Sequence, residues 1–136
     1  VRLEIIPGDG KQTLTKYRAR THDIFIGPWG TDYWDPNSNA DTFTSNPDNS
    51  VSGTNKTLAW RNSWDVPALT EATRAALVEP DSGKRAEAYR KLQREVLATS
   101  PFVVLYQQIE VAAIRSGLKG YKLAPFGPNL LSTVSK

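Results

Sequence analysis

The residues best suited to chemistry lie in one short stretch in which large aromatic rings alternate with carboxylates: Trp29, Asp32, Tyr33, Trp34 and Asp35. A carboxylate there can pair with a cationic group of a ligand. Neighbouring indole rings exclude water and strengthen such a pair by lowering the local dielectric. The same composition also suits a loop whose rings fill a gap in the core and whose carboxylates cap turns. Composition alone does not separate these two interpretations, and the stretch is our candidate ligand-binding site.

Groups for covalent catalysis are sparse elsewhere in the chain. His22 is the only histidine, there is no cysteine, and no Gly-x-Ser-x-Gly turn occurs, so a nucleophile lacks an evident base. We interpret His22 as an exposed residue at a strand edge. Asp32 and Asp35 could act as the acid and base of a hydrolase domain, although a loop fixes neither their separation nor their environments. We therefore expect no enzyme and no catalytic residue. The hydrolase domain and a purely structural interaction domain are the alternatives from other classes.

The sequence also argues against metals, cofactors and nucleic acid. Its loop carboxylates lack the spacing and the closing glutamate of a calcium loop, and no glycine-rich phosphate cradle opens a helix. A net charge of +3 is small and spread along the chain, whereas nucleic-acid modules concentrate basic residues. We expect no metal site, no cofactor and no nucleic-acid partner.

Length and composition predict one domain. The chain has 136 residues, 39% of them hydrophobic, which suffices for a single buried core. Its longest strongly apolar run, 102–106, is far shorter than the roughly 20 residues that span a bilayer. No signal segment is recognisable in the chain, and the absence of methionine suggests a processed or excised piece.

Strands and helices are predicted to alternate around the candidate site. Apolar alternation or β-branched runs predict strands over 1–6, 23–26, 102–106 and 111–114. Helical periodicity and capping signals predict helices over 11–20, from Asp65 to about 79, and from 81 or 82 to about 99, with a helical turn near 39–43. Between the second strand and the next full helix lies a long polar loop, 29–63, that is expected to carry function. The predicted fold class is α/β, a small mixed sheet flanked by helices.

The run DIFIGPWGTDYWDP, residues 23–36, resembles a signature of the peptide, dipeptide and nickel group of bacterial extracellular solute-binding proteins, family 5. Further features follow in the same order as in that family: Trp64-Asp65 opening a helix, the 81–89 segment, Ser100-Pro101 before an apolar strand, Arg115, and Leu118-Lys119-Gly120-Tyr121. No single piece is specific, but the ordered set covers nearly all of the chain from residue 23 onward.

The resemblance implies a periplasmic binding protein type II-like fold with two lobes that close over a solute by a hinge. Residues 1–136 would form a single segment of the C-terminal lobe, and the N-terminal lobe would lie outside this chain. The implied function is non-covalent capture of a small solute, above all a di- or oligopeptide, for an ABC permease in the inner membrane. The implied location is the periplasm, or the cell surface as a membrane-anchored lipoprotein.

The resemblance also implies residue roles. In peptide-binding relatives the Asp of a Trp-x-x-Asp step takes the α-ammonium group of the ligand and the Trp lines the cavity, which here are Asp32 and Trp29. Oligopeptide-binding relatives can carry an Arg three residues before that Trp, where this chain has Ile26. With Tyr33 and Trp34 adding aromatic surface, an oligosaccharide, opine-like or metal-chelate ligand stays open as an alternative within the group.

Overall fold

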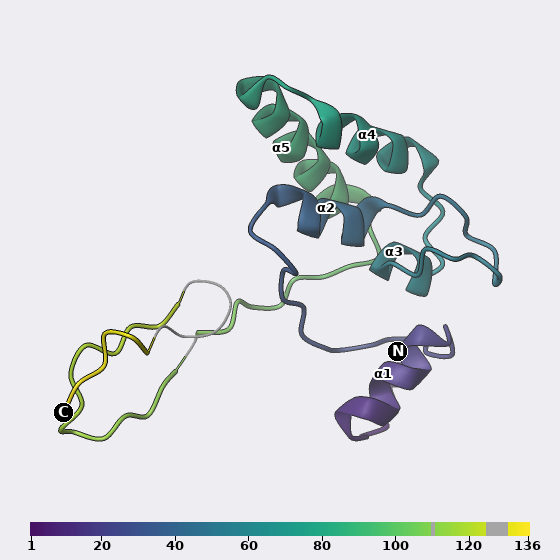
Figure 1. Ribbon diagram of the computed structural model, residues 1–136. Coiled ribbons are helices and arrows are strands. Elements are labelled where there is room, and N and C mark those ends of the chain that lie inside the picture. The colour runs from purple at the N-terminus through teal and green to yellow at the C-terminus, as the bar shows by residue number, and fades with distance from the viewer. Residues whose placement is uncertain (110, 125–130) are drawn as a thin grey trace. The chain divides into compact units, whose positions relative to one another are not determined.

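A computed structural model describes residues 1–109, 111–124 and 131–136, which form two compact units, 1–102 and 103–136. The helices of the described residues all lie in the first unit (Figure 1): α1 (Gly10–Arg18), α2 (Pro36–Thr44), α3 (Leu58–Arg61), α4 (Pro67–Val78) and α5 (Ser82–Thr99). The predictions of α1, α4 and α5 are confirmed to within a few residues. α2 is longer than the single turn that was expected, and α3 was not predicted.

Aspartates begin three of these helices, because a side-chain oxygen can accept a hydrogen bond from a backbone N–H that has no partner in the first turn. Asp9 accepts from the backbone N–H of Gln12, and Asp81 accepts from that of Lys84. α4 begins differently. Its N-cap is Val66, with Pro67 in the first turn, so the sequence-based expectation that Asp65 opens and caps this helix is wrong.

The core of the first unit lies where α2, α4 and α5 pack against one another (Figure 1). Ala76 of α4 meets Tyr89 and Leu92 of α5, all more than nine-tenths buried, and partly buried alanine and leucine side chains surround them. Small side chains on α4 let the helices approach closely. This cluster fixes the position of α2, and α2 in turn fixes the loop before it.

A polar layer joins α2 to α4 beside the apolar core. Thr44 and Thr73 form a buried hydroxyl–hydroxyl hydrogen bond, and the Thr70 hydroxyl accepts from the backbone N–H of Asn46 at 2.9 Å. The Asn46 amide donates to the Trp64 carbonyl oxygen at 2.8 Å. These hydrogen bonds hold α2 in one orientation against α4, although the Asn46 side-chain oxygen is buried without a partner.

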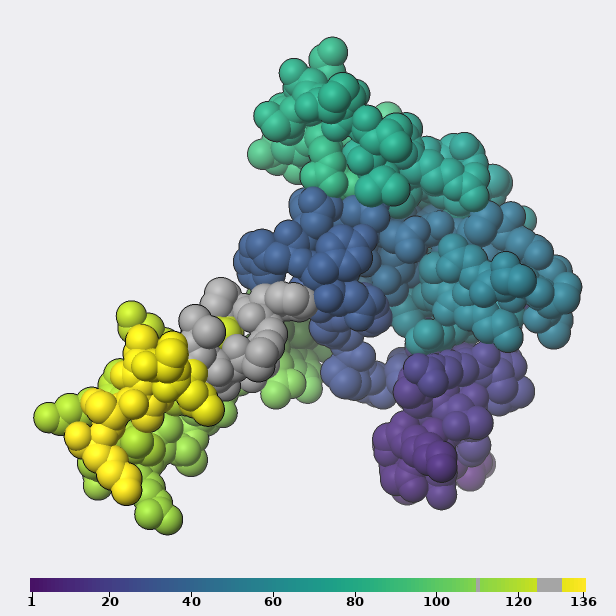
Figure 2. Space-filling model, viewed as in Figure 1, coloured from purple at the N-terminus to yellow at the C-terminus, as the bar shows by residue number. Residues whose placement is uncertain are grey.

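Tyr17 connects α1 to α3 and to the segment before residues 29–35, which we call the aromatic loop. Its ring stacks on Phe25 with centroids 4.0 Å apart, and its hydroxyl accepts from the Asn62 amide at 2.7 Å. His22 lies edge-on to the same ring, partly buried, so the interpretation as an exposed strand-edge residue is wrong. In the space-filling view the N-terminal purple atoms abut teal atoms of the region around α3 (Figure 2).

The predicted small mixed sheet is wrong for the residues that the structure describes. The segments 1–6, 23–26, 102–106 and 111–114 form no strand, and their large apolar side chains are mostly exposed. A strand requires neighbouring strands to pair its backbone N–H and C=O groups, whereas β-branched composition only reports that a residue would fit a pleated surface. These segments have the composition of strands, but no described strand lies beside them to pair with their backbones.

In the second unit, the backbones of Lys119 and Ser135 exchange two hydrogen bonds in an isolated antiparallel bridge. Gly120 follows with a φ of 73°, and a Cβ atom there would collide with the Thr133 carbonyl oxygen. Only glycine tolerates both conditions.

Candidate functional site

The aromatic loop is tied to the helical core at Asp35. This carboxylate accepts from the backbone N–H of Asn37, which caps α2, and pairs with the Arg85 guanidinium of α5 at 2.8 Å. The hydrogen bond from Arg85, followed by the one from Asn37, holds the pKa of Asp35 below its ordinary value. Asp35 is therefore an ionised anchor. It is unsuited to exchanging protons with a substrate near neutral pH, which weakens the hydrolase hypothesis.

Tyr33 belongs to the same anchor. Its hydroxyl accepts from the Asn37 side-chain amide at 3.0 Å, and the Asn37 side-chain oxygen accepts from the Tyr89 hydroxyl at 3.1 Å. Burial is the main cause that raises the pKa of Tyr89. The chain of contacts runs from the loop through α2 to α5, and it positions the residues that come just before it.

Trp29 and Asp32 come before Asp35 in the sequence and are also bound to α2. The Trp29 indole N–H donates to the Asn39 side-chain oxygen at 2.9 Å, and its ring meets Phe43 edge-on at 6.0 Å. The backbone N–H of Asp32 donates to the Ser38 hydroxyl at 2.9 Å, which fixes the backbone and leaves the carboxylate exposed. α2 thus holds both residues in place.

Both residues line one open groove of about 610 Å³, within the range typical of small-ligand sites. Its walls come from α1, the segment before α2, α2 itself and the residues around α3: Leu14, Tyr17, Arg18, Phe25, Pro28, Trp29, Asp32, Thr42, Asn55, Lys56, Thr57, Leu58 and Arg61. Ile26, Tyr33 and Trp34 are exposed and are not among these lining residues. The structure brings together two of the five predicted site residues.

Three cations in the groove wall were not predicted from the sequence: Arg18, Lys56 and Arg61. Arg61 lies over the Tyr17 ring at 5.5 Å, and its Nε donates to the Lys56 carbonyl oxygen at 3.1 Å. Burial lowers the pKa of Arg61, and repulsion from Arg18 lowers it further. No local signal marks these residues, because Arg18 is far from Lys56 and Arg61 in the sequence and only the fold brings the three together.

Among the described residues, no group of three or more histidine, cysteine, aspartate or glutamate side chains is arranged to hold a metal ion. Asp32 and Asp35 do not form a pair either. Asp32 faces the groove, whereas Asp35 is bound to Arg85. The groove therefore offers one carboxylate, one indole and three cations, a set suited to holding a charged ligand without reacting with it.

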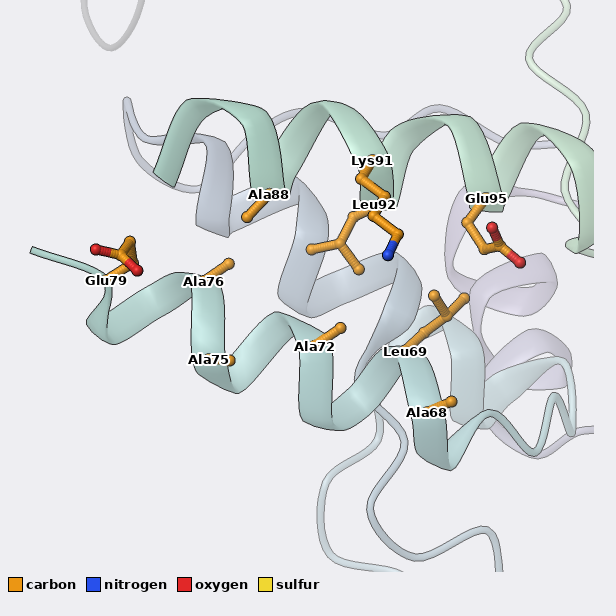
Figure 3. Close-up of a pocket in the computed structure, with 10 residues that line it drawn as sticks. All are labelled: Ala68, Leu69, Ala72, Ala75, Ala76, Glu79, Ala88, Lys91, Leu92 and Glu95. Carbon is orange, nitrogen blue, oxygen red and sulfur yellow. The ribbon is translucent and has the colours of Figure 1, made fainter. Parts of the chain in front are cut away.

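A second hollow, of about 510 Å³, lies between α4 and α5. Figure 3 shows alanine and leucine side chains of the two helices facing one another, with Glu79 and Glu95 near opposite ends and Lys91 beside Leu92. Binding sites combine apolar walls with a few convergent polar groups that orient the ligand. This hollow lacks such convergence, and we do not regard it as the site.

The chain is similar to periplasmic binding proteins of peptide transport. It is 27% identical over all 136 residues to the peptide transport periplasmic protein SapA of Salmonella typhimurium, covering 24% of that protein. It is 28% identical over 127 residues, 93% of this chain, to the probable ABC transporter periplasmic-binding protein SapA of Escherichia coli, covering 22% of it.

The chain thus spans about a quarter of the length of these relatives. No protein-family model matches the chain, and no solved structure matches it. Among the helices that the structure describes, none combines the length and the apolar composition needed to cross a membrane.

Proposed function

We propose that this chain is a segment of a solute-binding protein that captures a small peptide without covalent chemistry and delivers it to an ABC importer. One observation carries the proposal. Trp29 and Asp32, the residues to which the family resemblance assigns ligand contacts, line the same groove, in a chain that aligns over its whole length with a periplasmic protein of peptide transport. The oligosaccharide, opine-like and metal-chelate alternatives have no comparable support in the groove.

In this proposal Asp32 binds the α-ammonium group of the peptide. A charge-assisted hydrogen bond of this kind is about twice as strong as a neutral one and orients the ligand from its N-terminus. Trp29 covers the pair from water on one side, held there by its bonds to α2. A site of this design recognises the peptide terminus and leaves side chains free to vary.

The proposal also includes a second lobe that is not part of residues 1–136. Asp32 is exposed and the groove of residues 1–136 is open, so a second lobe that closes over it would complete the desolvation that makes the ion pair strong. We propose that residues 1–136 are one segment of the C-terminal lobe. The partners would be that second lobe and an inner-membrane permease, and the location would be the periplasm or the cell surface by way of a lipid anchor.

The test uses the full-length protein that contains this chain, titrated with trialanine in a calorimeter. Asp32→Asn should weaken binding by about 10- to 100-fold, the value of one hydrogen bond to a charged group. Asp23→Asn removes the same charge from an exposed residue that is not among those lining the groove, and it should leave the affinity unchanged. Equal affinity of wild type and Asp32→Asn would refute the assignment.

Native mass spectrometry of the full-length protein purified from its own cells supplies an independent check. The protein should carry small peptides of mixed sequence. A single sugar, opine or metal chelate in their place would contradict the proposed substrate class.

A further inference from the structure

We propose that Arg18, Lys56 and Arg61 form an anion-binding subsite that takes the C-terminal carboxylate of the peptide whose ammonium group Asp32 binds. The inference rests on the proposed function and makes it more specific. It limits the substrate to short peptides with both termini free.

The first support is position. The three cations come from α1, from the loop before α3 and from α3, and all line the groove that also contains Asp32. Three positive charges therefore stand in one wall against a single carboxylate. A groove with low-dielectric walls and an excess of one charge focuses its field on ligands of the opposite charge. Asp32 alone cannot neutralise the wall.

The second support is that these cations lack ion-pair partners among the described residues. The ion pairs there involve Arg74, Arg85, Arg90 and Arg94, and none involves Arg18, Lys56 or Arg61. Lys56 instead lies over the Trp60 ring at 5.1 Å, and Arg61 lies over the Tyr17 ring. These aromatic contacts hold Lys56 and Arg61 in place. The Arg61 Nε donates to the Lys56 carbonyl oxygen, and among the described residues the remaining donors of the three cations are available for a carboxylate.

The third support is that the charges of Arg18 and Arg61 repel each other. Arg61 is half-buried, and Arg18 is close enough for its charge to disfavour the charged form of Arg61. Unpaired like charges next to one another reduce stability, so an arrangement of this kind is expected where an anion from outside relieves it. By contrast, each side-chain nitrogen of nearby Arg20 already donates a hydrogen bond, one to Ser63 and two to Asn49.

The subsite also bears on Ile26. The resemblance suggests that an arginine can stand at this position to receive a ligand carboxylate, but Ile26 is exposed and is not among the groove-lining residues. A cation at that position would not be needed if α1 and α3 supply the positive charge from elsewhere in the groove wall.

The experiment titrates the full-length protein with trialanine, N-acetyl-trialanine and trialanine amide. Loss of the carboxylate in the amide should weaken binding by about 10- to 100-fold. The double variant Arg18→Gln/Lys56→Gln, which changes two exposed side chains, and the single variant Arg61→Gln should bind the free peptide more weakly and largely lose the preference over the amide. Arg61→Lys, which keeps the charge, should retain part of that preference.

Arg90→Gln is the matched control, because it removes one positive charge from an exposed face of α5, and it should keep the full preference for the free carboxylate. Equal binding of trialanine and its amide by the wild type, with acetylation still harmful, would overturn the anion subsite and leave the Asp32 proposal standing. Indifference to acetylation would overturn the Asp32 proposal. Absence of any trialanine binding would overturn both.

Discussion

The two hollows of the first unit differ in what their walls carry. Between α4 and α5 the wall is mostly alanine and leucine, with Glu79, Lys91 and Glu95 as its charged residues, and elsewhere on α5 Glu87 pairs with Arg90 and Arg94. Between α1 and α3 the wall contains stacked aromatic rings and three cations without ion-pair partners among the described residues. The first hollow is a gap in helix packing and the second has the features of a ligand site. Similar volume does not imply similar function.

The largest expected effect separates stability from binding. Leu92→Ala should lower the free energy of unfolding by about 2 to 4 kcal/mol, because Leu92 is buried in the α2–α4–α5 core and its truncation leaves a cavity. Urea denaturation of the full-length protein measures this. Leu97→Ala on the same helix is the control, since that side chain is 69% exposed, and it should change little.

At a temperature where Leu92→Ala is still folded, its affinity for trialanine should equal that of the wild type. A large loss of affinity in the folded variant would mean that the α4–α5 hollow takes part in binding, and the contrast between the two hollows would fail.

A smaller effect concerns the anchor between the loop and the core. Asp35 has a lowered pKa in the folded protein, so its contribution to stability is complete above its unfolded value of 3.8 and is lost as the pH falls below it. Asp35→Asn keeps a good helix cap but loses the ion pair with Arg85. The wild type should therefore be the more stable protein at neutral pH, and its advantage should shrink as the pH falls below 3.8.

Melting temperatures of the two proteins across that range test the sign of the effect. An advantage of the wild type that grows on acidification would show that Asp35 is not an ionised anchor.

Local signals explain which parts of the fold were predictable. α5 begins at an aspartate cap and ends before Pro101, and both signals lie next to the helix in the sequence. The predicted strands depend on partner strands, which periodicity within a segment cannot supply. The run 103–106 has β-branched and aromatic residues, yet its side chains are 66–80% exposed. Composition therefore predicted a strand where the described residues provide no partner.

The same distinction between local and long-range signals applies to the candidate site. Trp29 and Asp32 were predictable because they are close together in the sequence and resemble a family motif. Tyr33 and Asp35 stood in the same motif, but the structure uses them to anchor the loop to α2 and α5. Arg18, Lys56 and Arg61 come from three separate segments, and no spacing rule joins them. Their grouping depends on Tyr17, which packs α1 against α3.

The central claim is that the groove of Asp32, and not the α4–α5 hollow, binds the peptide. Amide hydrogen exchange of the full-length protein with and without saturating trialanine tests it most directly, because exchange reports local protection segment by segment. We predict slower exchange on binding across 14–18, 25–32 and 55–61, with the amides of α4 and α5 unchanged. Protection confined to α4 and α5, with none in the groove segments, would contradict the account.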